Sequence, residues 1–237
     1  MLYRAMQRVF SALIKLLSKA TIEGFENLPD SGGFLLAGNH MSMADIPLGF
    51  AYLGDPNFRG WVAAKWSSHP LLAPIVYIGG GLFIRRGEVD RSSLQAAVDW
   101  LKSGKPFALS PEGTRSRNGK LQRAKTGAAY LAHAADVMVL PMGIVGTDQA
   151  FRTLFRELRR PEITLRLGKP FKLPPLDENN RNASLRANTD EIMCRIAVLL
   201  PSRHWGYYAE YPRLKELLEQ VEANSEPEPE TGTLSNP

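Results

Sequence analysis

Short apolar runs alternate with stretches of helical periodicity along most of this chain. Apolar residues recur at helical spacing over residues 46–53, 69–76, 91–103, 124–135 and 185–220, the last interrupted by Pro201. The apolar runs between them have the length of buried strands and read GFLLAG, WVAA, GLFIRR, FALSPEG, VMVLPMGI and ITLRLG. Strands that alternate with helices predict an α/β domain with a central sheet flanked by helices.

Residues that end or interrupt regular structure support this division. Asp90 is placed to cap the helix over residues 91–103, and Gly104 to end it. The letters RNGK at residues 117–120 are typical of a turn. Pro141 is unusual within an apolar run, because proline cannot donate a ladder hydrogen bond. It predicts a sheet edge, a bulge or a strand end that lines a cavity.

The first twenty residues predict a basic amphipathic helix that precedes the domain. They contain four basic residues and no acidic one. Their apolar residues recur at helical spacing, namely Leu2, Met6, Val9, Leu13 and Leu16, with Phe10 and Leu17 beside them. Such a helix either lies in a membrane interface or packs its apolar stripe on the domain, and the segment alone leaves both alternatives open.

No other stretch resembles a membrane anchor. The most apolar run, residues 70–84, is short and contains two prolines and three glycines, which argues against a transmembrane helix. The N-terminal apolar stretch is not followed by a small-residue cleavage site, so no secretory signal is expected.

Composition and charge predict one domain with a basic folded part. The chain has 237 residues, of which 44% are hydrophobic, and its single cysteine, Cys194, excludes an internal disulfide and fits a reducing compartment. The formal net charge is +5, but residues 222–237 carry four glutamates and no basic residue, which leaves +9 on residues 1–221. We therefore expect a folded domain over residues 21–221, a disordered acidic tail and an anionic partner.

A histidine and an aspartate follow the first apolar run at a spacing that is compatible with a catalytic dyad. The stretch AGNHMSMADIP places His40 at a strand end and Asp45 five residues later. If the chain turns Asp45 back onto one ring nitrogen, the carboxylate fixes the tautomer and leaves the other nitrogen to accept a proton. The same letters match a helix-capping box in which Ser42 is the N-cap and Asp45 reaches back.

Two further charged segments stand at the ends of apolar runs. GGGLFIRRGEVD delivers Arg85 and Arg86, whose side chains point to opposite faces of a strand. SPEGTRSRNGK places Glu112, Thr114 and Arg115 in a tight turn, where an arginine can hold a phosphate with two parallel hydrogen bonds. Taken alone, each segment is more typical of an ordinary charged turn or strand end than of a site.

The order and spacing of these segments resemble the glycerophospholipid acyltransferase family, most closely its 1-acylglycerol-3-phosphate acyltransferase branch. His-x4-Asp, GLFIRR, PEGTRS and LP after an apolar run follow one another as in that family, and the resemblance covers about residues 20–210. Ser110 and the loose fourth motif over residues 140–142 depart from the family's pattern. The resemblance implies a central mixed sheet and supports the membrane-surface alternative for residues 1–20.

The resemblance also implies a role for each motif residue. His40 is then the general base, and Asp45 orients it and stabilises its imidazolium. The residues implied in binding the acceptor are Arg86, Glu112, Gly113, Thr114 and Arg115. Implied supporting residues are Asn39, Lys65, Arg85, Lys125 and Pro141.

The implied reaction transfers an acyl group from acyl-CoA or acyl carrier protein to a lysophospholipid hydroxyl, without a metal, a bound cofactor or an acyl-enzyme. The leading acceptor is 1-acylglycerol-3-phosphate. Glycerol 3-phosphate, a lyso-ornithine lipid and other lysophospholipids are the alternatives. A lipid hydrolase or transacylase, and a non-enzymatic protein that binds membrane surfaces, are the rival functions.

The implied partner surface is an anionic membrane, with peripheral attachment at the cytoplasmic face of a bacterial-like inner membrane. Nucleic acid is not expected as a partner, because the chain has no recognisable basic stripe interleaved with aromatic residues.

Overall fold

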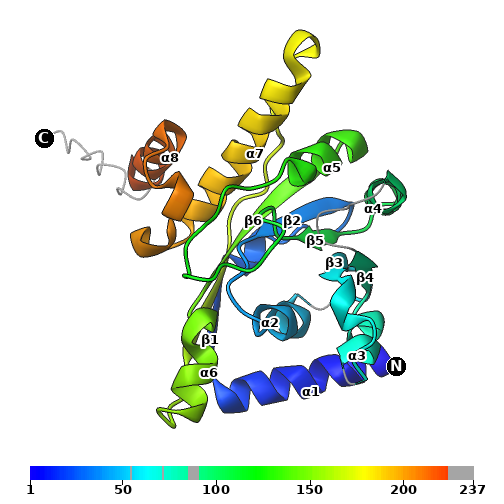
Figure 1. The fold of residues 1–237 in the computed structure, drawn as a ribbon, viewed down its shortest axis with the longest axis vertical. Helices are drawn as coiled ribbons and strands as arrows, with labels where there is room; N and C mark the ends of the chain where they lie inside the picture. Colours follow the sequence, from blue (N-terminus) through cyan, green and yellow to red (C-terminus); the bar gives the residue numbers. More distant parts are fainter. Residues whose placement is uncertain (54, 71, 85–90, 224–237) are drawn as a thin grey trace, which may run out of the picture.

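A mixed sheet of seven strands runs through the part of the chain described by this computed structural model, residues 1–53, 55–70, 72–84 and 91–223 (Figure 1). In spatial order β1-β7-β6-β2-β5-β3-β4, only β6 and β7 are antiparallel neighbours. The strands are β1 Lys19–Glu23, β2 Phe34–Gly38, β3 Arg59–Ala63, β4 Gly81–Ile84, β5 Phe107–Leu109, β6 Met138–Val145 and β7 Glu162–Leu167. The predicted α/β class with a central mixed sheet is confirmed.

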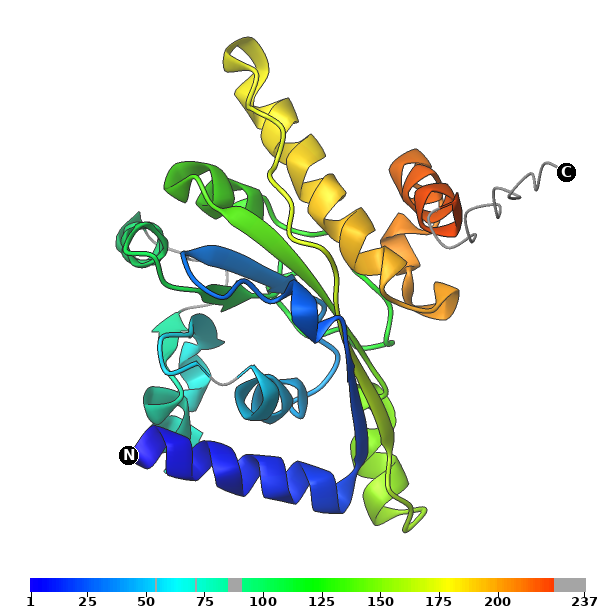
Figure 2. The ribbon, with the colours of Figure 1, turned by 180° about the vertical axis from the view of Figure 1, so that it is seen from behind.

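Helices cover both faces of this sheet, with α4, α5 and α7 on one face and α1 and α2 on the other (Figures 1 and 2). The α-helices are α1 Leu2–Leu17, α2 Asp45–Tyr52, α3 Leu72–Ile78, α4 Arg91–Lys102, α5 Gly127–Ala135, α6 Thr147–Phe155, α7 Arg181–Val198 and α8 Pro212–Ala223. Short 3-10 helices are η1 Phe25–Asn27, η2 Ala64–Trp66, η3 Glu178–Asn180, η4 Ser202–His204 and η5 Gly206–Tyr208.

The position of strand β2 in the middle of the sheet accounts for its uninterrupted apolar sequence. All five of its residues are buried, because helices pack on both faces of this central strand. Leu35 and Ala37 belong to the cluster under α4, α5 and α7, whereas Phe34 and Leu36 belong to the cluster under α1 and α2. The strand therefore ends rigidly at Gly38, immediately before the predicted dyad.

Besides short 3-10 helices, one strand and one α-helix were not predicted from the pattern, β1 and α6. Strand β1 reads KATIE and alternates between exposed and half-buried residues at the edge of the sheet, so it gives no continuous apolar run. Helix α6 begins after Gly146, whose φ is +90°, and leaves large apolar side chains in solvent. Most predicted helices and strands are present with bounds shifted by a few residues, as for α5, which begins at Gly127.

Pro141 lies within β6, a central strand of the sheet. Its ring is accommodated because β6 pairs with β7 only from Met142 onward and with Phe171 at Val139. The partner strand is interrupted between these points, and the Gly168 N–H donates to the Pro141 carbonyl at 2.9 Å. Of the three predicted settings for Pro141, the structure is nearest to the bulge, since the residue is buried and not at an edge.

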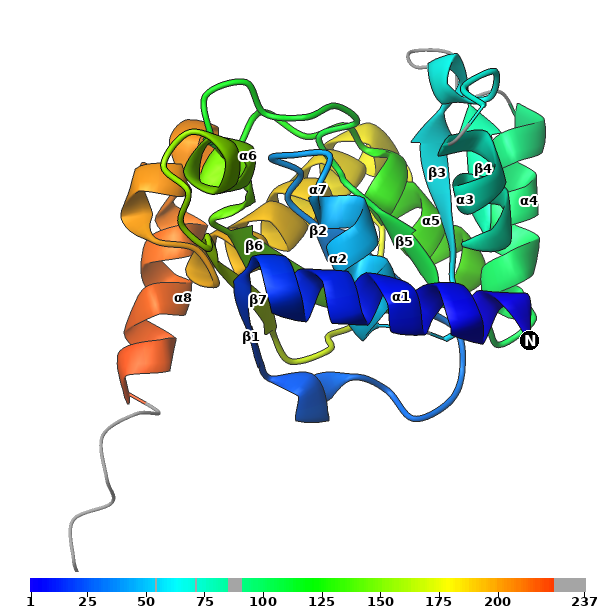
Figure 3. The same ribbon diagram turned by 90° about the horizontal axis from the view of Figure 1, so that it is seen from below.

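Helix α1 crosses beneath α2, as Figure 3 shows from below. The rings of Tyr3 and Phe10 meet Phe50 of α2 edge to face, and the Tyr3 hydroxyl and the Ser11 hydroxyl donate to backbone carbonyls after and within α2. The opposite side of α1 is exposed and apolar, with Leu2, Val9, Leu13, Leu16 and Leu17 in solvent. The helix therefore packs on the domain through one side and leaves most of the predicted stripe uncovered.

Within the described residues, no helix is both long enough and apolar enough to cross a membrane. Several predictions concern parts of the chain outside the described residues. These are Arg85 and Arg86, the cap Asp90, and all but the first two residues of the acidic tail.

Candidate active site

Asn39 fixes the end of β2 and so the position of the next residue, His40. Its amide group donates to the Ile144 carbonyl at 2.9 Å and accepts from the Ile144 N–H at 2.7 Å, so the side chain continues the ladder toward β6. Asn39 is buried, and both ends of its amide are satisfied. His40 therefore leaves the sheet at its carboxyl edge, where α/β folds present ligand sites.

The chain turns after His40 and brings Asp45 back to it. Oδ2 of Asp45 lies 2.7 Å from Nδ1 of His40 and accepts the N–H groups of Met41 and Ser42, each at 2.8 Å. Because a carboxylate can only accept, Nδ1 carries the proton of the neutral ring and Nε2 is left as an acceptor. Among the described residues Nε2 has no hydrogen-bond partner, and the His40 side chain is 17% exposed.

The capping alternative and the dyad alternative coexist in this turn. Asp45 is the first residue of α2, where its charge is favourable beside the helix N-terminus, and the same oxygen binds both the imidazole and the turn backbone. The N-cap is Ala44 and not Ser42, whose hydroxyl instead accepts the Ala44 N–H at 3.3 Å. Asp45 is only 7% exposed, so it is rigidly held against the ring.

The loop after β5 holds the backbone of His40 on both sides. Glu112 accepts the His40 N–H through Oε1 at 3.4 Å and the Gln122 N–H through Oε2 at 2.9 Å. The Ser116 N–H donates to the His40 carbonyl at 2.8 Å. The Gln122 side chain in turn donates to the Arg115 carbonyl at 3.3 Å. The loop and the histidine are thus one hydrogen-bonded unit.

Burial makes the carboxyl group of Glu112 a weaker acid than usual. The residue is 3% exposed, and burial raises the pKa of its carboxyl to about 7, against the opposing effect of the two backbone N–H donors. The nearby charge of Asp45 raises this pKa further. The two oxygens of Glu112 face the backbone N–H groups of His40 and Gln122. The residue does not line the cationic pocket described next.

A pocket of about 370 Å³ opens beside the dyad. It is lined by Lys65 of η2, by Met41 next to the histidine, and by Thr114, Arg115, Ser116 and Arg117 of the loop. Three cationic side chains and no acidic one line it, so it is suited to a phosphate group. Gly113, with φ +68°, makes the bend that brings Thr114 and Arg115 to this side.

The His40–Asp45 dyad and the loop after β5 both lie in the part of the chain that matches a known protein family. The model of the family described as Acyltransferase matches residues 19–145, more than half of the chain. This chain belongs to the acyltransferase family. The match includes β2, the His40–Asp45 turn, the loop after β5 and all of β6, and leaves α6 to α8 outside.

Two curated relatives share this acyltransferase region. A 1-acyl-sn-glycerol-3-phosphate acyltransferase of Chlamydomonas reinhardtii is 35% identical over 173 residues, which are 70% of this chain and 48% of the relative. The protein of the same name from Borreliella burgdorferi is 29% identical over 138 residues, 56% of this chain and 54% of the relative. The chain thus spans about half the length of the curated relatives it matches.

A solved acyltransferase shares the fold over nearly the whole chain. The 1-acyl-sn-glycerophosphate (LPA) acyltransferase PlsC from Thermotoga maritima superposes with a TM-score of 0.63 and 23% identity, covering 93% of this chain and 80% of that one. At this identity the likeness shows the fold of an acyltransferase and not its substrate.

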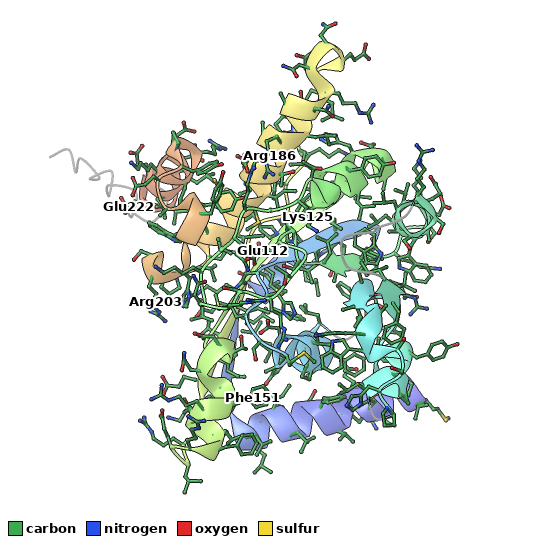
Figure 4. All side chains as sticks on the ribbon, viewed as in Figure 1. Glu112, Lys125, Phe151, Arg186, Arg203 and Glu222 are labelled. Carbon is green, nitrogen blue, oxygen red and sulfur yellow. The ribbon has the colours of Figure 1, made fainter. Side chains whose placement is uncertain are left out.

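The other residues implied by the family resemblance lie apart from the dyad. Lys125 lines a second pocket of about 500 Å³ with Arg123, Thr126 and Arg186, on the side of Glu112 toward α5 and α7 (Figure 4). Its aliphatic chain nevertheless covers Gly113, where an added Cβ would lie 3.4 Å from the Lys125 Cδ. Pro141 lines neither pocket.

Sequence reasoning missed four residues that the structure brings to the site: Met41, Ser116, Arg117 and Gln122. Ser116 and Arg117 directly follow the PEGTR letters, and the positive charge of Arg117 was a usable signal. Gln122 gave no signal, because its contribution to Glu112 is a backbone N–H that any residue other than proline possesses.

Proposed function

We propose that this chain transfers an acyl group from an acyl thioester to the free hydroxyl of a lysophospholipid, with 1-acylglycerol-3-phosphate as the leading acceptor. The observation that carries the proposal is the Nδ1–Oδ2 contact of 2.7 Å between His40 and Asp45, beside a pocket lined by Lys65, Arg115 and Arg117. The names of the relatives point to the same acceptor.

In the proposed mechanism, Nε2 of His40 takes the proton of the acceptor hydroxyl as that oxygen attacks the thioester carbonyl carbon. The tetrahedral intermediate collapses, the carbon–sulfur bond breaks and the imidazolium returns the proton to the leaving thiolate. Asp45 keeps the proton on Nδ1 and stabilises the imidazolium. The products are an ester and a free thiol, from coenzyme A or acyl carrier protein.

Within this proposal the residues around His40 divide into two roles. Lys65, Arg115 and Arg117 bind the acceptor phosphate, because their charges line the pocket beside Met41. Glu112 positions His40 through the backbone rather than holding phosphate, since its two oxygens accept the N–H groups of His40 and Gln122 and it does not line the pocket.

A direct test is to assay the purified chain with a panel of lysolipids and with both acyl-CoA and acyl carrier protein donors, measuring the released thiol and the acylated product. Stoichiometric thiol and product from 1-acylglycerol-3-phosphate supports the proposal. Thiol release without acylated product would assign a hydrolase, and product without a thioester donor would assign a transacylase.

Replacing Arg115 by lysine is expected to raise the Michaelis constant for the lysophospholipid by about ten- to a hundredfold. Lysine keeps the charge but loses the planar fork that can meet two phosphate oxygens, and a charge-assisted contact contributes about 1.5–3 kcal/mol. The constant for the thioester should move little. Steady-state kinetics with each substrate varied in turn checks this, and an effect confined to the thioester would contradict the phosphate role.

We also propose that the exposed side of α1 attaches the chain peripherally to an anionic membrane, at the cytoplasmic face. The acceptor of the proposed reaction is a lipid, and α1 presents an apolar stripe flanked by Arg4, Arg8 and Lys15 with no acidic residue. Because the other side of the helix packs on α2, this attachment requires no rearrangement of the domain.

The double variant Leu13→Asp/Leu16→Asp is expected to bind anionic vesicles about tenfold or more weakly, because each exposed leucine loses its favourable transfer into lipid. Turnover of detergent-dispersed substrate should change much less, since neither side chain is buried in the domain. Vesicle sedimentation gives the partition. Equal partition of variant and wild type would leave α1 as a packing helix only.

A further inference from the structure

Helix α6 and the turn after it expose three large apolar side chains that the proposed reaction does not use. Phe151 is 53% exposed, Phe155 is 69% exposed and Leu158 is 86% exposed. The two rings are stacked nearly parallel, with centroids 6.3 Å apart, and present one continuous apolar surface. We call these three residues the α6 corner. Such a surface on a folded domain usually marks an interaction site.

Leu158 is held in a backbone conformation that disfavours its side chain. Its φ is +51°, in the left-handed region where glycine or asparagine is the usual residue and where leucine costs about 1 kcal/mol or more. The Arg159 N–H donates to the Thr153 carbonyl at 3.1 Å and closes this turn. Leu158 belongs to neither core cluster, so packing within the described residues does not account for a leucine at this position.

The α6 corner adjoins the exposed stripe of α1. The guanidinium of Arg160 donates to the backbone carbonyls of Lys15 and Ser18 at the end of α1. Figure 1 shows α6 next to this end of the helix, and Figure 4 labels Phe151 in the same region. The exposed Leu16 and Leu17 of α1 thus lie on the same border of the molecule as the corner.

The positive charge around the α6 corner favours an anionic partner. Residues 147–160 contain four arginines and two acidic residues, one of which, Glu157, pairs with Arg152. Arg156 and Arg159 are exposed and have no ion-pair partner among the described residues. A second copy of this surface would place arginines against arginines, whereas an anionic lipid surface offers both apolar depth and negative charge.

We propose that the α6 corner is a second membrane-contacting surface, which inserts Phe151, Phe155 and Leu158 into an anionic bilayer while Arg156 and Arg159 meet lipid phosphates. Two contacts, on α1 and on α6, fix the orientation of the domain on the membrane, where one helix would leave it free to rotate about the helix axis. The inference extends the proposed attachment through α1, but its test measures binding and not acyl transfer.

Two variants test the α6 corner in the chain of 237 residues, with vesicles of phosphatidylcholine with and without phosphatidylglycerol. Phe155→Asp is expected to weaken binding to the anionic vesicles about tenfold or more, and Leu158→Asn about fivefold. Val221→Asp is the matched control, because Val221 is also exposed and lies on α8, away from α1 and α6, and it should bind as wild type does. Vesicles without phosphatidylglycerol should bind every form more weakly.

Stability separates this role from a structural one. Asparagine accepts the left-handed conformation better than leucine, so Leu158→Asn should keep or raise the melting temperature while it loses binding. A lower melting temperature, unchanged binding of both variants, or a solution dimer that Phe155→Asp dissociates would each overturn the proposal. If no form, wild type included, releases thiol from detergent-dispersed substrate, the proposed reaction fails while the binding result stands.

Discussion

Replacing His40 by alanine is expected to lower turnover by about 10²- to 10⁴-fold while the fold is retained, because a positioned general base contributes about that factor. Among the described residues, the side chain hydrogen-bonds only to Asp45, whereas its backbone N–H and carbonyl hold the loop after β5. Alanine keeps both backbone contacts. The loss should therefore fall on the chemical step and not on the architecture of the pocket.

Thiol release under saturating substrate, together with the thermal unfolding midpoint, measures both parts of this expectation. His133→Ala serves as the matched control, since this half-buried histidine of α5 bonds to Asn188 and not to the loop after β5. If a well-folded His40→Ala protein turns over substrate nearly as fast as wild type, His40 is not the general base. This conclusion does not depend on the result for His133→Ala.

The second large expected effect concerns stability and pH, through Glu112. Its pKa rises from 4.5 in the unfolded chain to about 7 in the folded protein. Between these values the folded state binds one proton more than the unfolded state, so this group's contribution to the free energy of unfolding is fully present below pH 4.5 and is lost as pH rises through 7. At about 1.4 kcal/mol per pH unit, the total loss is about 3 kcal/mol.

Glu112→Gln removes this titration, so the stability of wild type relative to the variant should decrease by about 3 kcal/mol between pH 4 and pH 8. Urea unfolding of both proteins at several pH values measures the difference, in which all other titrating groups cancel. Glu162→Gln is the control for the substitution itself, because the Glu162 side chain is exposed on β7. A constant difference for Glu112→Gln would mean that folding leaves the pKa of Glu112 close to 4.5.

The sequence was most informative where a local pattern and a local turn coincide. The apolar run before His40 is a strand buried on both faces, and the five-residue spacing to Asp45 is closed by a turn within the same segment. Both follow from neighbouring residues, so the strand, the α/β class and a contact between His40 and Asp45 were predictable. The catalytic role of that pair was implied only by the family resemblance.

Contacts between distant segments were not predictable from the pattern. Glu112 reads as a charged turn residue, yet it is buried because its two oxygens accept N–H groups from His40, 72 residues away in sequence, and from Gln122. The sequence around Glu112 contains no signal that predicts the position of the His40 backbone. Strand β1 was missed for a similar reason, since its half-buried alternation acquires meaning only when β7 is beside it.

The pairing of β1 with β7 also governs the order in which this chain can fold. Lys19 pairs with Glu162, 143 residues later, and a ribosome adds roughly 5–20 residues per second. For roughly seven to thirty seconds the first strand therefore has no partner, while α1 and α2, close in sequence, are already complete. Under the proposed attachment through α1, a chain still on the ribosome presents this helix to lipid before the synthesis of Arg160, which hydrogen-bonds to the end of the helix.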